Sequence, residues 1–253
     1  DENKVLQIKK EGQWRNIRAA FRYVTQKPWN RIPIDCKTLI FNPVVSCLAG
    51  GRNKLVAAKA YEHFNSEIAA SGLKINVPHT IYDVAKMEIP MLIQSLGGRG
   101  VVKNPYSNAG QGVYTITNQA ELDRFMEFEE NYDQYIVQSL IGNSSWSSVS
   151  PEGELYHVGT MPNKKNQFFV ADTRFMVCSG PDGFRAVSLY ARKAAEPLAD
   201  TLNDSADSWS MLGTNLSQKL GEDEWGSDTD RLMLMDTRDF NKLGIGIDQL
   251  IEG

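Results

Sequence analysis

The stretch VVKNPYSNAGQGVYTI, residues 101–116, gives the strongest indication of what this chain does. Its apolar start and alternating end are typical of two β-strands, and the residues between them are typical of a loop. A single lysine, Lys103, ends the first strand. A buried lysine costs free energy unless an anionic group meets it. The pattern therefore predicts an anion beside Lys103.

The loop after Lys103 consists of residues that leave the backbone accessible. Ser107, Asn108, Gly110 and Gly112 place little or no side chain between backbone N–H groups and a ligand. Successive N–H groups form an anion nest, and a nearby ammonium adds charge, which together suit a polyphosphate. The spacing is neither the GxxxxGK[ST] P-loop nor a GxGxxG dinucleotide motif. An ordinary hairpin loop with an extended lysine at the strand end explains the same residues.

Composition limits the function classes. The 253 residues are 42% hydrophobic and 23% charged, which is typical of a soluble globular protein. The net charge of −4 argues against a general nucleic-acid binder, and no apolar run approaches the roughly 18 residues of a membrane span. Cys36, Cys47 and Cys178 are widely spaced, as in a protein with reduced thiols. We therefore expect a cytoplasmic protein without nucleic-acid or membrane partners.

The hydrophobic pattern predicts a mixed α+β (α/β) chain. Helices are expected at 53–72, at 83–96 with a boundary near Pro90, and at 118–132. The first has an apolar face and a stop at Gly72; the third has Asn118 and Glu121 as a capping pair. Strands are expected at 37–50, broken by Pro43, and at 74–81, 134–142, 154–180, 184–194 and 231–236. The apolar face of the first helix consists of Ala57, Ala60, Tyr61, Phe64 and Ile68.

The order of these segments resembles the ATP-grasp superfamily, which includes D-alanine–D-alanine ligase, glutathione synthetase and the ribosomal-protein glutamate ligases. In that superfamily a lysine opens a helix, a "gIpvP.T" strand follows, a second lysine precedes a glycine-rich loop, and a strand leads into an adenine-binding hinge. The matching segments are Asn53-Lys54, Gly72 to Thr80, Val101 to Val113 and Ile136 to Ile141.

The resemblance implies an ATP-grasp fold in which two α+β lobes clamp ATP. Residues 1–51 are then the remnant of a preceding substrate domain, and residues 52–253 are the ATP-grasp domain. Its central lobe is expected at about 84–141 and its C-terminal lobe at about 142–253.

The second half of the chain continues the resemblance. ADTRFMVCSGPDGFRAVSLYARKA is similar to the family's "D.R..v..g..v.a..R.a" strands, and GTNLSQKLG to its "NL..G" segment. In the terminal segment RLMLMDTRDFNKLGIG, strand position favours Asp236 as the metal-binding acid, with Arg238 where the family has Asn. Residue type favours Asp239 and Asn241 instead, and the register stays open, with Asp228 as a possible additional acid.

The resemblance also implies roles for single residues. Lys54 and Lys103 would hold the α- and β-phosphates of ATP, under a loop containing Ser107, Asn108, Gly110 and Gly112. Adenine would lie at the hinge, formed by Gln138, Ser139, Leu140 and Ile141. Mg²⁺ would be bound by Asp236, Asp239 and Asn241, whose oxygen ligands suit it. The catalytic group would comprise Arg192, Arg174 and Asn215.

Simpler interpretations of these residues remain. Residues 134–142 are also typical of a plain core strand, and Arg174 could merely pair with Asp172. Trp209 could line an acceptor site or fill a loop. Arginines between 18 and 31 could recognise a carboxylate or lie at a domain interface.

The implied activity is ATP- and Mg²⁺-dependent ligation of a carboxylate to an amine through an acyl phosphate, on small-molecule or peptide substrates. Two alternatives are an ATP-grasp kinase, which would phosphorylate a hydroxyl, and a regulatory module that binds ATP without turnover. A homodimer is left open.

Overall fold

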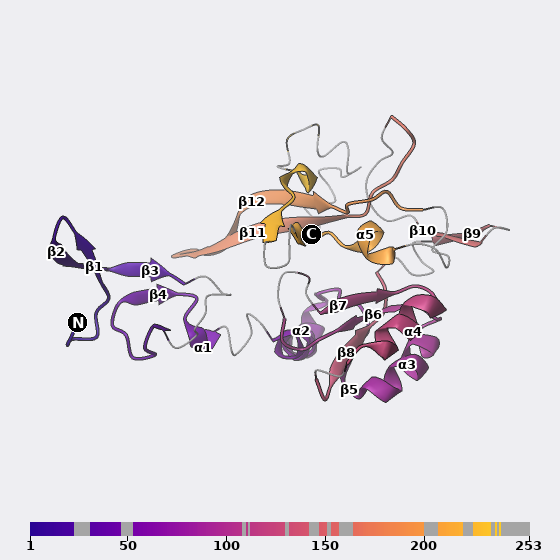
Figure 1. The fold of residues 1–253 in the computed structure, drawn as a ribbon, viewed down its shortest axis with the longest axis horizontal. Coiled ribbons are helices and arrows are strands. Elements are labelled where there is room, and N and C mark those ends of the chain that lie inside the picture. The colour runs from indigo at the N-terminus through magenta and orange to yellow at the C-terminus, as the bar shows by residue number, and fades with distance from the viewer. Residues whose placement is uncertain are drawn as a thin grey trace.

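The structure is a computed structural model of the 253-residue chain (Figure 1). It describes residues 1–22, 31–46, 53–107, 110, 112–129, 132–141, 147–150, 153–156, 164–199, 207–219, 225–233, 236 and 238. The fold is mixed α+β with several small sheets, as the sequence pattern predicts. Among the described residues, no helix combines the length and the apolar character needed to cross a membrane.

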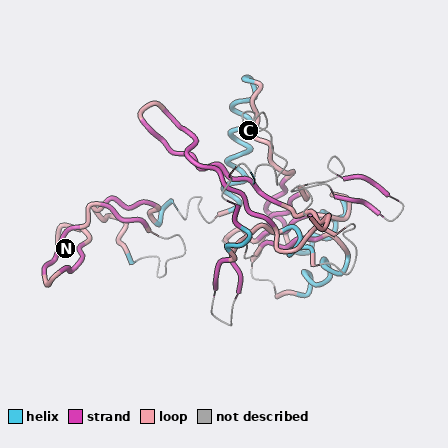
Figure 2. The backbone as a smooth tube through the Cα atoms, turned by 90° about the horizontal axis from the view of Figure 1, so that it is seen from above, coloured by secondary structure: helices cyan, strands magenta, loops and turns pink. Residues whose placement is uncertain are grey.

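The N-terminal segment contains two small sheets. An antiparallel pair is formed by β1 (Gln7–Lys10) and β2 (Gln13–Asn16), and a parallel pair by β3 (Ala19–Phe21) and β4 (Leu39–Phe41). The short helix α1 (Val44–Ser46) follows. Figures 1 and 2 show this segment extending away from the rest of the molecule.

The predicted helix at 53–72 is confirmed. It consists of α2 (Lys54–Ile68) and the 3-10 helix η3 (Ala69–Ser71). The side chain of Asn53 caps its start by accepting hydrogen bonds from the backbone of Leu55 and Val56. Gly72 ends it in the left-handed conformation, with φ +77°.

A four-stranded antiparallel sheet lies at the centre of the molecule. Its strands, in the order β5-β8-β6-β7, are β5 (Thr80–Val84), β8 (Tyr135–Gln138), β6 (Gly100–Lys103) and β7 (Val113–Ile116). Two helices cover one face: α3 (Ile89–Ser95), preceded by the 3-10 helix η4 (Lys86–Glu88), and α4 (Gln119–Glu127).

The main hydrophobic core lies between this sheet and its two helices. Its buried side chains include Val102 and Val137 from the sheet, Ile89 and Ile93 from α3, and Phe125 from α4. Because side chains alternate along a strand, the residues next to Val102 and Val137 face the opposite side of the sheet. That second face carries the candidate site.

The C-terminal part is organised around a long antiparallel ribbon, β11 (Ala171–Gly180) with β12 (Gly183–Lys193), to which β15 (Leu232–Met233) adds a short third strand. The helix α5 (Ser208–Leu212) lies between this ribbon and the central sheet in Figure 1. The remaining elements are β9 (Ser147–Ser150), β10 (Gly153–Tyr156), β13 (Ser217–Lys219), β14 (Trp225–Ser227) and the 3-10 helix η5 (Thr229–Arg231).

Three expected elements differ from the structure. The strand expected at 74–81 forms only from Thr80 onward, and it continues to Val84, so the helix expected at 83–96 begins only with η4 at Lys86. The expected boundary near Pro90 is confirmed, because α3 starts at Ile89 with Pro90 in its first turn. Buried strands were expected at 37–50. Instead, β4 exposes Leu39 and Phe41, and a helical turn follows Pro43.

Candidate functional site

Lys103 lies on the sheet face that α3 and α4 leave uncovered. It ends β6, one residue beyond the fully buried Val102, and pairs across the sheet with Val113 and Ile136. Its Nζ donates a hydrogen bond to Oε1 of Gln138 on β8. Because Gln138 is neutral, this bond satisfies a donor of the ammonium group without balancing its charge.

The hydrogen bonds continue beyond Gln138. Its Nε2 donates to Oγ1 of Thr80 at 2.7 Å, and that hydroxyl donates to the carbonyl of Pro78 at 2.8 Å. The amide of Gln138 is therefore oriented from behind, with its oxygen toward Lys103. Gln138, which the resemblance places at the adenine hinge, thus orients the side chain of Lys103.

Burial lowers the pKa of Lys103 from its ordinary value of 10.5. No carboxylate among the described residues forms an ion pair with it. Desolvation disfavours the charged amine, and an anion placed beside it would reverse that effect. Lys103 is therefore a partly buried amine without a counter-charge among the described carboxylates.

The start of α2 meets the loop that follows Lys103. Asn53 forms an isolated β-bridge with Tyr106, and the backbone N–H of Lys54 donates to the carbonyl of Pro105 at 2.9 Å. The Lys54 ammonium donates to the carbonyl of Ser107 at 2.8 Å, to its hydroxyl, and to the carbonyl of Asn104 at 3.2 Å. The start of α2 is thus joined to residues 104–107, about fifty positions later in the chain, directly after Lys103.

The glycines of the loop allow close contacts. Gly110 has φ +79°, and a β-carbon there would lie 2.9 Å from Nδ2 of Asn215 and 3.1 Å from Cζ2 of Trp209. Gly112, with φ +61°, packs in the same way against the side chain of Asn104. Both positions require glycine for conformation and for space. Asn108 lies outside the described residues.

The expected hinge, residues 138–141, follows β8 and packs against α5. The N–H of Ser139 donates to the carbonyl of His79 at 2.9 Å. Leu140 is buried in a small apolar cluster with Val101 and Met211. Ile141, the last of the four predicted adenine contacts, is largely exposed. A buried apolar cluster that includes Val101 therefore lies on the same face of the sheet as Lys103.

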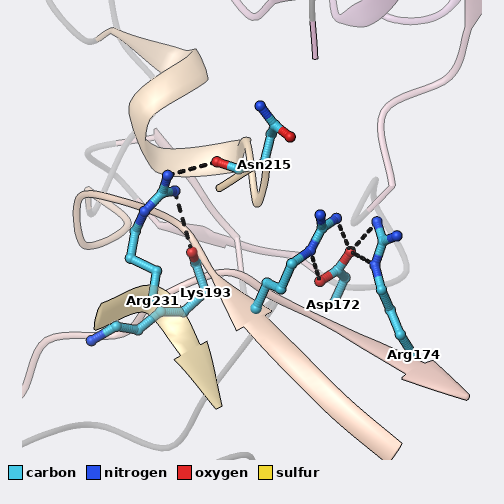
Figure 3. A network of polar contacts seen from close by, with 6 residues as sticks. Asp172, Arg174, Lys193, Asn215 and Arg231 are labelled. Atoms are coloured by element: carbon cyan, nitrogen blue, oxygen red, sulfur yellow. Dashed lines mark hydrogen bonds and ion pairs between the residues drawn. The ribbon is translucent and has the colours of Figure 1, made fainter. Parts of the chain in front are cut away.

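Two predicted arginines converge on one carboxylate, as Figure 3 shows for Arg174. Asp172 on β11 pairs with Arg192 on β12 in the strand register. Arg192 donates to both carboxylate oxygens, at 3.2 Å from Nε and 2.8 Å from Nη2, and Arg174 donates from Nε at 2.9 Å. Burial acts to raise the pKa of Asp172, but the hydrogen bonds and charges of Arg192 and Arg174 outweigh it and lower that pKa below 3.8.

Arg231 makes contacts that sequence patterns did not predict. It is buried in η5 and bound to Asp228 at 2.9 Å. Its Nη2 donates to the carbonyl of Asn215 at 2.6 Å, and its Nη1 to the carbonyl of Lys193 at 3.5 Å (Figure 3). It links Asn215, which packs against Gly110, to the strand that carries Arg192. Asp228, considered above as a metal ligand, holds this arginine.

A second unpredicted contact joins α5 to the central sheet. Ser208 is fully buried; its hydroxyl lies 2.6 Å from Oε1 of Glu121 and 2.5 Å from Oγ1 of Thr115, and its N–H donates to Glu121 at 3.1 Å. The other oxygen of Glu121 accepts two hydrogen bonds from Thr117, both at 2.9 Å. Asn118 caps α4 as predicted, and Glu121 also fixes the position of α5.

The predicted metal ligands are only partly within the described residues. Asp236 is bound by Arg238, at 2.8 Å from Nη2 and 3.1 Å from Nε, while Asp239 and Asn241 lie outside the described residues. Among the residues that are described, no group of three His, Cys, Asp or Glu side chains could hold a metal ion. The described part of the chain therefore does not by itself form a magnesium site.

Comparison with known proteins finds a likeness to solved structures. No protein-family model and no curated protein sequence matches the chain. The crystal structure of a RimK domain protein ATP-grasp from Sphaerobacter thermophilus DSM 20745 is similar, with 14% sequence identity, a TM-score of 0.39, and coverage of 68% of this chain and 71% of that chain. This likeness concerns the overall fold alone and assigns no residue a role.

Proposed function

We propose that this chain is an ATP-dependent ligase of the ATP-grasp type, which joins a carboxylate to an amine. One observation supports this above the others: the Lys54 ammonium at the start of α2 donates hydrogen bonds to Asn104 and Ser107, in the loop that directly follows Lys103. The resemblance implies one phosphate site for both lysines, whereas a plain hairpin with an extended lysine gives no reason for Lys54 to contact this loop.

The residues on this face suit the parts of ATP. Lys103 offers a buried positive charge, and Lys54 offers an ammonium now held by Ser107 and Asn104. Backbone N–H groups near Gly110 and Gly112 would bind phosphate oxygens. The apolar cluster around Leu140 would receive the adenine ring. Bound ATP would supply the phosphoryl group that activates the carboxylate.

The proposed reaction has two steps. A substrate carboxylate oxygen attacks the γ-phosphorus, the bond from that phosphorus to the ADP oxygen breaks, and an acyl phosphate forms. The amine nitrogen then attacks the acyl carbon, the carbon–oxygen bond to phosphate breaks, and a proton is released from nitrogen. Arg192 and Arg174 would stabilise the negative charge that gathers on the transferring group and on the tetrahedral carbon's oxygen.

Asp172 has a positioning role in this proposal. It fixes the two guanidinium groups, with a bidentate contact to Arg192. Asn215 would lie near the phosphates, because it packs directly against Gly110. Magnesium is proposed to use Asp236, Asp239 and Asn241, as the resemblance implies.

The ligase proposal is tested by measuring ADP formation with panels of carboxylates and amines. Hydroxylamine provides a direct readout, because it traps an acyl phosphate as a hydroxamate. We expect carboxylate-dependent hydroxamate that is lost in Lys103→Ala and retained in Lys59→Ala, an exposed lysine on α2. ADP formation with a hydroxyl substrate and without hydroxamate would favour the kinase alternative and contradict the ligase.

A second candidate is a module that binds ATP without turnover. The observation that favours it is the contact of Asp236 with Arg238, which occupies the position where the superfamily has Asn. Such a module would bind ATP through Lys103 and form no ADP with any substrate pair. Turnover by the unmodified chain with any carboxylate and amine pair would exclude the module, whereas ATP binding that Lys103→Ala weakens, with no ADP formed by any pair, would favour it.

A further inference from the structure

The N-terminal arm, residues 1–46, has no apolar core in its described part. Among residues 1–22 and 31–46 the buried residues are Arg22 and Thr38, both polar. Phe21, Leu39 and Phe41 of the parallel pair β3–β4 are each more than half exposed. Parallel strands are normally covered on both faces, and a two-stranded sheet is marginal alone. The described part of the arm therefore leaves these apolar side chains without cover.

The arm also contains a groove. Its volume is about 380 Å³, and its lining includes Ile34, Leu39, Val44 and Val45 together with the basic residue Lys37. A helix that presents large apolar side chains, with an acidic group nearby, suits a groove of this chemistry.

The helix surface, defined here as Tyr61, Phe64, Leu73, Ile75 and Val77, offers such a partner. None of the fifteen residues of α2 is buried, although its sequence has an apolar face. Tyr61 and Phe64 are both close to half exposed, as are Ile75 and Val77, and Leu73 is more exposed still. Asn65 holds residues 73–77 beside the helix, with both of its hydrogen bonds to the Ile75 backbone at 2.8 Å.

The charges of the two parts are complementary. Residues 1–46 carry nine Lys and Arg but four Asp and Glu, a net charge of +5, whereas the rest of the chain has 18 and 27, a net charge of −9. Glu62 and Glu67 lie on α2 itself, next to the aromatic pair. A basic arm and an acidic body attract each other in solution.

We propose that two copies of this chain exchange their N-terminal arms, so that the groove and the exposed face of β3–β4 in one copy pack against the helix surface of the other. Every copy carries one arm and one helix surface, so the exchange covers both surfaces twice and closes as a two-fold dimer. The extended position of the arm in Figures 1 and 2 leaves it able to reach a second molecule.

Sedimentation equilibrium over a dilution series tests this proposal. We expect a mass twice the 28.3 kDa of one chain, with weaker association at high salt, because screening reduces the attraction between the arm and the body. Phe64→Asp should raise the dimer dissociation constant at least about tenfold, since it places a carboxylate in an apolar contact. Phe184→Asp, at the turn of the β11–β12 ribbon, should leave it unchanged. Tyr61→Asp gives a second test if Phe64→Asp loses its helical circular dichroism.

Chemical cross-linking identifies which surfaces meet. In a background with Cys36, Cys47 and Cys178 replaced by serine, one chain would carry Phe41→Cys and the other Tyr61→Cys. A short bis-maleimide should link the mixed chains into a heterodimer. A monomer at every concentration, a dimer that tolerates both Phe64→Asp and Tyr61→Asp, or a cross-link that forms only within a chain carrying both cysteines would overturn the proposal.

Discussion

The central sheet and the β11–β12 ribbon hold their functional side chains in opposite ways. In the sheet, Lys103 is the cation of a face backed by a dense core that includes Val102, Val137 and Phe125. In the ribbon, Ala191 is the one residue buried among β11 and β12, and Arg192 is held mainly by its contact with Asp172.

This difference indicates which forces position each half of the site. Apolar packing fixes the sheet, so it can hold a cation without a described counter-charge. The ribbon lacks such packing and depends on an ion pair that is partly shielded from water. The two halves should therefore respond differently to loss of packing, to loss of charge and to pH.

Loss of packing should have the largest effect. Phe125 is 3% exposed and contacts Tyr114 and Tyr135, with ring centroids 5.0 and 5.7 Å away. Phe125→Ala should lower the free energy of unfolding by about 3–5 kcal/mol. Phe184→Ala in the ribbon, where the side chain is 81% exposed, should change it by less than about 0.5 kcal/mol. Urea denaturation measures the free energy of unfolding of both variants. Equal decreases would contradict the stated difference between the central sheet and the ribbon.

Loss of charge should affect the ribbon next. The side chains of Asp172 and Arg192 are 31% and 15% exposed, so Asp172→Asn should cost about 2–3 kcal/mol by leaving a shielded guanidinium without its carboxylate. Its pKa is lowered, so this contribution is present above pH 3.8 and is lost as the pH falls through the lowered value.

The matched control for this change is Asp236→Asn. Asp236 and Arg238 also make a 2.8 Å contact, but their side chains are 50% and 84% exposed. Its loss should cost less than about 1 kcal/mol. If thermal denaturation shows the same decrease in stability for both variants, shielding from water does not strengthen the contact between Asp172 and Arg192.

The contact between the two halves can be tested at Gly110. Gly110→Ala and Gly98→Ala both place alanine at a positive φ, of +79° and +81°, which should cost each about 1–2 kcal/mol. Gly98 has open space beside it, whereas Gly110 faces Asn215 and Trp209. The proposed site therefore predicts weaker ATP binding for Gly110→Ala alone, measured by calorimetry. Equal affinities in the two variants would remove this loop from the site.

The smallest effect should come from the proton of Lys103. Its lowered pKa means that the folded state bears the cost of a buried charge at neutral pH and loses that cost as the pH rises toward 10.5. The stability of the unmodified protein relative to Lys103→Met should therefore increase over that range, and saturating ATP should flatten the increase. A difference that does not change with pH would show that burial does not perturb this amine.

Sequence patterns were informative where hydrophobic alternation and the order of segments indicate which residues end strands and begin helices. The alternation around Val102 placed Lys103 at a strand end, and the ordered motifs brought Asn53 and Lys54 toward the same loop. The pairing of Arg174 with Asp172 was expected as the simpler interpretation of that arginine, whereas the contact of Arg192 with the same carboxylate was not predicted.

Other contacts could not be predicted, because they carry no local signal. Arg231 binds backbone carbonyls of Asn215 and Lys193, and Ser208 meets Glu121 87 residues away. Neither contact changes the hydrophobic period of its own segment. The prediction that β4 is buried was wrong. An apolar sequence shows that a strand gains from burial, but it does not show which other segment packs against that strand.

The most direct test of the proposed site is calorimetric titration of ATP, with and without magnesium, into the unmodified chain, Lys103→Ala, Lys54→Ala and the control Lys59→Ala. The proposed site predicts magnesium-linked binding that Lys59→Ala retains and that each of the other two variants weakens at least about tenfold, the equivalent of one charged hydrogen bond. No ATP binding by the folded, unmodified chain, or equal binding by all four proteins, would contradict it.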